Sequence, residues 1–260
     1  MPQADVNGTT IAYRIDGTAD GPWLMLSNSL GTNLGMWDHQ VAALGRRFRI
    51  IRYDSRGHGA SGVPDGPYTI EMLGRDALGL LDHLGVERTH FVGLSKGGMV
   101  GQWLGANAPG RLDRLVLSNT SSHMAPPELW DARIEAVLGR GMAAVADSVL
   151  DRWFTPSFRE RSAAEVARVR EMLVATRPEG YAACCAAIRD MDFREANRAI
   201  TVPTLVIAGG MDPATPVAHA ELIAAAIRGS ELTVIDEAAH LANIEQADAY
   251  NRILADFLSR

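Results

Sequence analysis

The sequence has few cysteines and no long apolar run. Its only two cysteines, Cys184 and Cys185, are adjacent, which disfavours a structural disulfide, and neither histidines nor further cysteines stand at the spacing of a zinc site. We therefore expect no metal, and two small buried side chains within a helix. No apolar run approaches the roughly 18 residues that span a bilayer, so no membrane partner is expected.

Acidic residues outnumber basic residues, 31 to 25. The formal net charge is −6, which offers no surface for polyanions, so nucleic acid is not an expected partner. The N-terminal segment lacks the basic and apolar regions of a secretory signal, and we expect a reduced, cytoplasmic protein. A composition that is 47% apolar and 22% charged is typical of a globular chain, but it leaves the oligomeric state unknown.

Short apolar segments alternate with segments of helical periodicity over the first 120 residues. Asn7-Gly8 predicts a hairpin near the N-terminus, and Thr69 is expected to cap a helix that extends to Leu84. Further strands are predicted at 23–27, 48–53, 90–94, 114–119, 204–209 and 231–235. Strands separated by helix-length segments indicate an α/β fold, a mostly parallel sheet with helices on both faces.

The pattern changes after residue 120. Residues 121–197 contain no strand candidate, and prolines at 156 and 178 divide them into several helices. We expect an α/β core of residues 1–120 and 198–260, with a helical cap of residues 121–197 inserted after the sixth strand. Such a cap would lie over the strand ends, where α/β folds bind ligands.

The segment His90–Gly98 carries the strongest motif of the chain. An apolar strand runs into Gly93-Leu94-Ser95-Lys96-Gly97, and a helical segment follows directly. In this context the G-x-S-x-G pattern predicts a nucleophile elbow, a sharp turn that projects the serine hydroxyl above the sheet. Glycines two residues before and after the serine avoid clashes with the neighbouring strand and helix. Ser95 is thus a candidate nucleophile.

A serine needs a base, and the base needs a carboxylate to orient it. In α/β-hydrolases the partners follow in the order serine, acid, histidine, each after a late strand. Asp212 follows the strand at 204–209, and His240 follows the strand at 231–235. This order predicts an α/β-hydrolase fold in which Ser95, Asp212 and His240 form the catalytic group.

His58 is the main competing base, because it also lies in a loop after a strand. Its surroundings, Asp54-x-Arg56-Gly57-x-Gly59, are better explained as a hydrogen-bonded structural turn, with glycines that permit tight geometry. The competing interpretation of Asp212 is a turn that begins at Asp212-Pro213. The strand before Asp212 and the histidine after it favour the catalytic interpretation.

The tetrahedral intermediate needs two backbone N–H donors. One is expected from Lys96, directly after the nucleophile at the start of a helix, where the helix dipole also favours an anion. The other is expected from the loop Asn28-Ser29-Leu30-Gly31-Thr32, and its position in the loop points to Leu30. These two residues form the predicted oxyanion hole.

The motifs resemble those of the 3-oxoadipate enol-lactonases. The resemblance rests on Ser27–Thr32 with Met36-Trp37, on Tyr53–Gly59 and on the elbow; it continues through Trp130 and Arg152–Thr155 in the cap to His240–Glu245. It covers nearly the whole chain. It implies hydrolysis of an enol-lactone to 3-oxoadipate through an acyl-enzyme, in the breakdown of aromatic compounds by the β-ketoadipate pathway, without a metal or organic cofactor.

Such a substrate is a small anionic lactone, so the site should contain a cation. Arg133, three residues after Trp130 on the same helical face, is the candidate, and a solvent-exposed arginine is the competing interpretation. Trp130 and Trp153 are candidate pocket walls, although core packing explains them equally well. Lys96 departs from the family, where an uncharged residue is expected. Its side chain either holds the anionic substrate or, as we expect, turns towards solvent.

Other functions stay open from sequence alone. A general carboxylesterase, a C–C hydrolase and a cofactor-free perhydrolase share the fold, and cap contacts that spacing does not reveal decide between them. A non-catalytic ligand-binding module is the alternative from another class, and the complete set Ser95, Asp212 and His240 argues against it.

Overall fold

The computed structural model describes residues 1–260 and is built on one eight-stranded sheet in the order β1-β2-β4-β3-β5-β6-β7-β8. Strands β1 and β2 are antiparallel to their neighbours, and the six others run parallel. The strands are β1 (Gln3–Val6), β2 (Thr9–Gly17), β3 (Trp23–Ser27), β4 (Arg49–Tyr53), β5 (Thr89–Leu94), β6 (Leu112–Ser118), β7 (Thr204–Gly209) and β8 (Glu231–Ile235). The hairpin turns at Asn7 and Gly8, both at positive φ, as Asn-Gly predicts.

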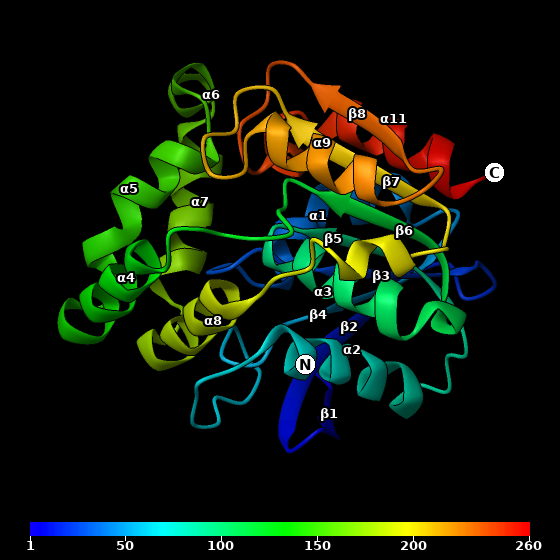
Figure 1. Ribbon diagram of the computed structural model, residues 1–260, viewed down its shortest axis with the longest axis horizontal. Helices are drawn as coiled ribbons and strands as arrows, with labels where there is room; N and C mark the ends of the chain where they lie inside the picture. The colour runs from blue at the N-terminus through cyan, green and yellow to red at the C-terminus, as the bar shows by residue number, and fades with distance from the viewer.

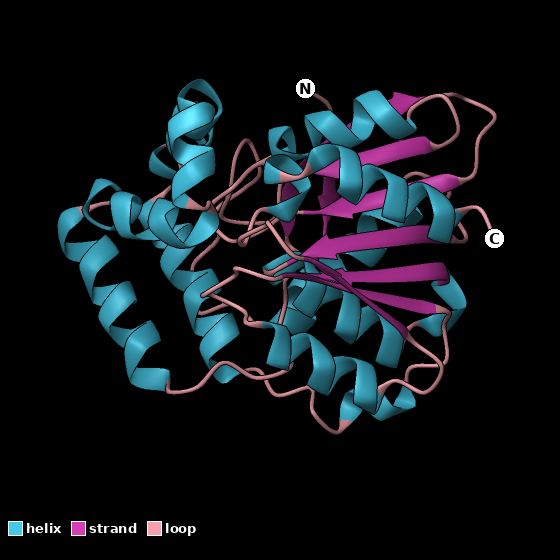
Figure 2. Cartoon of the chain, turned by 90° about the horizontal axis from the view of Figure 1, so that it is seen from above, coloured by secondary structure: helices cyan, strands magenta, loops and turns pink.

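Helices cover both faces of this sheet (Figure 2). Helix α1 packs with α11 and helix α2 packs with α3, which confirms the predicted α/β fold. Thr69 caps α2 by accepting from the Met72 N–H, as predicted. No helix is long and apolar enough to cross a membrane. The helical elements of this part are η1 (Leu34–Trp37), α1 (Asp38–Leu44), α2 (Ile70–His83), α3 (Lys96–Asn107), η2 (Pro109–Arg111), η3 (Ala196–Ala199), α9 (Val217–Ala226), α10 (Ala242–Glu245) and α11 (Ala247–Leu258).

Five helices between β6 and β7 form a cap beside the sheet (Figure 1). They are α4 (Pro127–Arg140), α5 (Ala143–Trp153), α6 (Pro156–Arg161), α7 (Ala163–Val174) and α8 (Pro178–Asp190). Helices α6 and α8 begin at the predicted prolines, whose fixed φ suits the first helical position. Cys184 and Cys185 are free thiols buried in α8, as expected.

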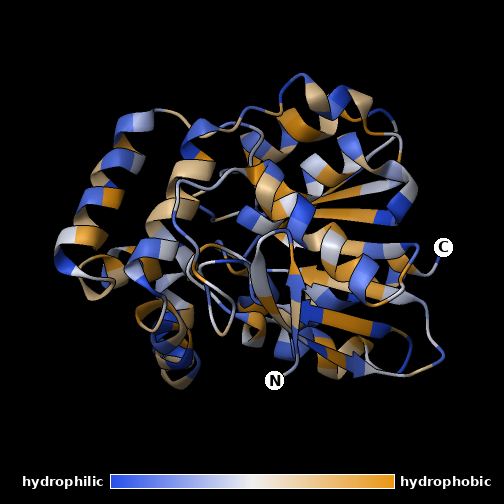
Figure 3. Ribbon diagram, turned by 90° about the horizontal axis from the view of Figure 1, so that it is seen from below, coloured by the Kyte–Doolittle hydropathy of each residue, from blue (hydrophilic) through white to orange (hydrophobic).

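The apolar core is continuous from the sheet into the cap. A single cluster of 69 buried residues contains sheet residues such as Val92 and cap residues such as Trp153. Figure 3 shows hydrophobic residues concentrated in the strands between the two helical layers. Because burial of one large apolar side chain contributes roughly 1.5–3 kcal/mol, this shared core holds the cap against the strand ends.

The register of the parallel strands brings distant loops together. Neighbouring strands align Ser27 with Gly93, Leu94 with Ser118, and Gly209 with Ile235. The loops that follow these strands therefore leave the sheet at one edge, which faces the cap. The candidate residues Ser95, Asp212 and His240 all follow at this edge.

Candidate active site

Ser95 lies on a strained turn between β5 and α3. Its backbone has φ 57° and ψ −114°, a conformation that non-glycine residues rarely adopt. A Cβ at Gly93 would come 2.1 Å from the Gly97 carbonyl oxygen, and a Cβ at Gly97 would come 2.1 Å from the Ser27 carbonyl oxygen. Only glycine therefore fits at either position. The turn has the geometry expected of a nucleophile elbow.

Asp212 and His240 are in direct contact. His240 Nδ1 lies 2.8 Å from Asp212 Oδ2, and both side chains are buried. Oδ1 of Asp212 accepts from the backbone N–H groups of Ala214 and Thr215, and Oδ2 also accepts from the Thr215 hydroxyl at 2.7 Å. These donors hold the carboxylate in one orientation towards the imidazole.

The protonation of this pair follows from its surroundings. Burial alone would raise the pKa of Asp212, but the charge and hydrogen bond of His240, together with hydrogen bonds from Thr215, hold that pKa below its ordinary value. A carboxylate only accepts, so His240 Nδ1 carries the proton. Nε2 of His240 then has a free lone pair, as a general base requires.

Asn119 is a functional candidate that sequence reasoning missed. It follows β6 at positive φ, and its side-chain amide donates to Asp212 Oδ2 at 3.1 Å and to the Ala239 carbonyl at 3.2 Å. The same side chain thus joins the acid to the residue before His240. No motif marks it, because the contact arises only when β6 lies beside β7.

Ser95 and His240 face one small cavity of about 50 Å³. Neither the Ser95 hydroxyl nor His240 Nε2 bonds to another protein group, so both are free to engage a ligand. Other residues that line this cavity include Ser29, Leu30, Met99, Met124, Trp130, Val149, Trp153, Tyr181, Ile188, Ala214 and Thr215. The two tryptophans named from the sequence therefore lie at the candidate site and in the core at once.

The two predicted oxyanion donors, Leu30 and Lys96, have backbone N–H groups that bond to no group of the chain. Lys96 is the first residue of α3, so its N–H has no acceptor within the helix. Leu30 lines the cavity, and its N–H bonds to no other group of the chain, while the N–H groups of Ser29 and Gly31 on either side are both engaged. Both N–H groups are available to an oxyanion at Ser95.

The loop of His240 is tied to the cap. The Ala239 N–H donates to a Glu245 carboxylate oxygen at 2.8 Å, and the Leu241 N–H donates to the Trp153 carbonyl at 3.0 Å. Glu245 also accepts from the N–H and hydroxyl of Thr155. These bonds join two segments that lie far apart in the sequence, residues 153–155 and 239–245.

A larger cavity of about 340 Å³ adjoins the first, and the two share Met124, Trp130 and Ala214. Arg133 and Arg152 both line it, and neither pairs with a carboxylate of the chain. The Arg133 guanidinium lies over the Trp130 ring, 4.9 Å from its centroid. Burial and the nearby charge of Arg133 lower the pKa of Arg152. The sequence placed Arg152 in a cap motif but named only Arg133 as the candidate cation.

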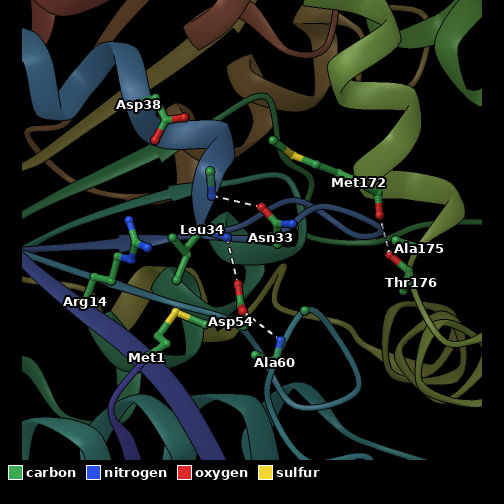
Figure 4. A pocket seen from close by; sticks show the side chains of 12 residues that line it. Met1, Arg14, Asn33, Leu34, Asp38, Asp54, Ala60, Met172, Ala175 and Thr176 are labelled. Carbon is green, nitrogen blue, oxygen red and sulfur yellow. Dashed lines mark hydrogen bonds between the residues drawn. The ribbon is translucent and has the colours of Figure 1, made fainter.

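Residues 54–61 form a turn beside the loop that contains Leu30. Asp54 Oδ1 accepts from the Leu34 N–H at 2.7 Å, and Oδ2 accepts from the Ala60 N–H at 2.9 Å (Figure 4). His58 is buried, and its Nε2 accepts from the Gly31 N–H at 2.9 Å. These bonds agree with the structural turn that the sequence predicts for Asp54 and His58.

His58 should make the fold sensitive to acid. Burial first, and then the charge of Lys96, lower its pKa to about 3 in the folded chain, against about 6.5 when unfolded. Below pH 6.5 the unfolded chain binds a proton that the native chain does not, so stability falls as the pH falls. This group should remove about 2 kcal/mol of unfolding free energy between pH 7 and pH 5.

Urea unfolding at both pH values measures this loss. The His58→Gln variant, whose amide oxygen can still accept from Gly31, should lose about 2 kcal/mol less than the parent over the same range. If both proteins lose the same unfolding free energy between pH 7 and pH 5, His58 is not the source of the acid sensitivity. A folded His58→Gln protein without activity would identify His58, rather than His240, as the base.

The prediction that the Lys96 side chain turns towards solvent is wrong. Lys96 is fully buried, and its Nζ donates to the Ser55 hydroxyl at 2.7 Å. At the first position of α3 the Cα–Cβ bond tilts back towards the helix N-terminus, which directs the side chain into the space beneath the 54–61 turn. It does not line the Ser95 cavity, so it is not placed to hold a substrate there.

The chain is similar to known hydrolases over nearly its whole length. The α/β hydrolase fold family matches residues 22–247. The 3-oxoadipate enol-lactonase 2 of Acinetobacter baylyi is 42% identical over 95% of this chain and 92% of its own. The 3-oxoadipate enol-lactonase 1 of the same organism is 38% identical over 96% and 94%. The crystal structure of the enol-lactonase from Burkholderia xenovorans superposes with a TM-score of 0.98 at 47% identity, over all of both chains.

Proposed function

The chain belongs to the 3-oxoadipate enol-lactonase family of the α/β-hydrolase superfamily, and on that premise we propose that it opens 3-oxoadipate enol-lactone to 3-oxoadipate. The observation that carries the proposal is a serine and a histidine at one cavity, with the histidine bonded to a buried aspartate, beside a second cavity with two arginines that have no carboxylate partner. The proposal places the reaction in the cytoplasm, in the β-ketoadipate pathway of aromatic catabolism.

Ring opening begins with attack by Ser95. His240 Nε2 takes the hydroxyl proton as the serine oxygen bonds to the lactone carbonyl carbon. Asp212 stabilises the imidazolium and fixes its orientation. The negative charge that develops on the carbonyl oxygen is stabilised by the N–H groups of Leu30 and Lys96, and the dipole of α3 favours it as well.

Collapse of the tetrahedral intermediate breaks the ring C–O bond. The imidazolium of His240 protonates the enol oxygen that leaves, and the enol ketonises, which draws the reaction forward. A water molecule, deprotonated by His240, then attacks the acyl-enzyme. Release of the acid regenerates the Ser95 hydroxyl and leaves 3-oxoadipate.

The adjoining cavity suits the carboxylate of the substrate. With the lactone carbonyl at Ser95, the acetate arm extends past Trp130 towards Arg133 and Arg152. Two guanidinium groups without a carboxylate partner favour a bound anion, because the anion relieves their mutual repulsion. Trp130 and Trp153 wall the apolar part of the site.

Substrate preference tests the function. We expect kcat/KM for 3-oxoadipate enol-lactone to exceed that for p-nitrophenyl acetate by at least about 100-fold, the discrimination that a charged hydrogen bond of up to about 3 kcal/mol supplies. Initial rates under the same buffer measure both, after subtraction of spontaneous hydrolysis. Comparable values for the two substrates would instead identify a general carboxylesterase.

Removing the charge of Arg133 should separate the two substrate types. Arg133→Met keeps an unbranched side chain over Trp130 but removes the guanidinium. KM for the enol-lactone should rise by about 10- to 100-fold, with little change for p-nitrophenyl acetate, because only the former carries a carboxylate. Arg152→Met should show the same selectivity.

Arg140→Met provides the matched control, since Arg140 is exposed at the end of the same helix. It should leave both KM values unchanged. An equal effect of Arg133→Met on the neutral and the anionic substrate would argue against a carboxylate site at Arg133.

A further inference from the structure

Lys96 is the only lysine of the 260-residue sequence, and the proposed reaction uses only its backbone. The side chain is wholly buried, and it forms no ion pair with a carboxylate. Its single hydrogen-bond partner is the Ser55 hydroxyl, 2.7 Å from Nζ. A buried ammonium with one neutral partner is costly, since burial disfavours the charged form.

Ser55 belongs to the 54–61 turn, which also anchors the loop of the other oxyanion donor. The His58 N–H donates to the Ser55 carbonyl at 3.0 Å, and His58 Nε2 accepts from the Gly31 N–H at 2.9 Å. Asp54, on the other side of Ser55, accepts from the Leu34 N–H (Figure 4). The free N–H of Leu30 lies directly before the anchored Gly31.

These contacts join the two oxyanion donors through one chain of bonds. It runs from the backbone of Lys96 along its side chain to Ser55, then through His58 to Gly31 and so to Leu30. We propose that the Lys96 side chain is a positioning residue that sets the distance between its own N–H and that of Leu30. The inference rests on the proposed acyl-enzyme chemistry at Ser95.

The positive charge of Lys96 also suits the His58 contact. His58 Nε2 accepts from Gly31 only while it is unprotonated, and a neighbouring cation opposes a second charge on the ring. The other charged groups near Nζ are the carboxylates of Asp54 and Asp76, and the Asp76 carboxylate is already paired with Arg56. Lys96 therefore supports the turn by a hydrogen bond and by its charge.

Two variants test the hydrogen bond between Lys96 and Ser55, one at the donor and one at the acceptor. Lys96→Met removes the ammonium and keeps an unbranched side chain, and Ser55→Ala removes the acceptor and keeps the lysine. Each should lower kcat per active serine by about tenfold with little change in KM, less than the 10²- to 10³-fold loss of a direct oxyanion donor. Lys96→Met should be at least as stable as the parent, because a buried charge is replaced by an apolar side chain.

Active serines are counted by the p-nitrophenol released when a p-nitrophenyl phosphonate reacts with Ser95, and p-nitrophenyl acetate serves as the substrate. A trifluoromethyl ketone, which forms a tetrahedral oxyanion on the serine, should bind about tenfold more weakly to both variants. Gln102→Leu is the control. It removes the buried hydrogen bonds that Gln102 of α3 makes with Ser121 and Asn197. This variant should lower the free energy of unfolding, while kcat per active serine stays within twofold of the parent.

The outcomes separate the inference from the proposed function. A normal release of p-nitrophenol by the parent, with unchanged kcat per active serine in Lys96→Met and Ser55→Ala, refutes the positioning role alone. If the variants contain fewer active serines but each active serine keeps the parental kcat, the substitutions act only on the structure. That result also refutes the positioning role. A parent protein that the phosphonate does not modify refutes the proposed function, and the positioning role with it.

Discussion

Ser95→Ala should reduce hydrolysis of the enol-lactone to the spontaneous rate, a loss in kcat on the order of 10⁶ if the hydroxyl is the nucleophile. Of the residues with a hydroxyl group that line the cavity, only Ser95 lies on the strained turn, directly before the first N–H of α3. The backbone strain at residue 95 is the same for alanine and serine, so the variant should fold as the parent does.

Stopped-flow or initial-rate measurements on purified Ser95→Ala check this loss, with thermal unfolding as the test of folding. Ser29→Ala is a matched control, because Ser29 lines the same cavity and its hydroxyl makes no hydrogen bond. Ser29→Ala should lower kcat/KM less than tenfold. Turnover by Ser95→Ala above one part in a thousand would rule out the acyl-enzyme mechanism.

Asp212→Asn should lower kcat by about 10⁴ without unfolding the protein. Oδ2 of Asp212 accepts from the His240 ring N–H, the Thr215 hydroxyl and the Asn119 amide, while Oδ1 accepts from two backbone N–H groups. An amide nitrogen at either position would face a donor. The histidine is then driven to the tautomer in which Nε2 carries the proton, and that tautomer is no base.

The kcat of Asp212→Asn, measured between pH 6 and 9, checks this prediction. Asp236→Asn is the control, since Asp236 is an exposed carboxylate in the loop before His240. This substitution should leave kcat unchanged. A loss smaller than about 100-fold in Asp212→Asn would show that the carboxylate does not control the tautomer of the base.

Local sequence signals predicted the elements around the site correctly. Asn7-Gly8 turns a hairpin, Thr69 caps α2, and the glycines of the elbow stand where a Cβ would collide with backbone. Each signal depends on neighbours within a few residues, so spacing alone reveals it. Ser95, Asp212 and His240 are far apart in the sequence, but each follows a strand that local pattern predicts, and parallel strands end at one edge of the sheet.

The residues that the sequence missed or misplaced are those whose surroundings depend on long-range contacts. Asn119 carries no motif, and the motif Arg152–Thr155 assigned no role to the Arg152 side chain; the contacts of both arise from strand order and from the packing of the cap helices. Lys96 was expected in solvent because lysine is usually exposed, and packing beneath the 54–61 turn overrode that preference. Composition and periodicity do not encode which distant segment lies above a helix terminus.

The sequence by itself determined the fold class and the candidate residues for the chemistry, since periodicity, turn residues and strand-end positions are local properties of the chain. Only the tertiary structure decided the environment of each group: the donors on Asp212, the arginines beside the cavity, and the burial of Lys96. The physical reason is that the pKa of a group, its hydrogen bonds and its access to a ligand depend on what packs around it, and those neighbours come from distant parts of the chain.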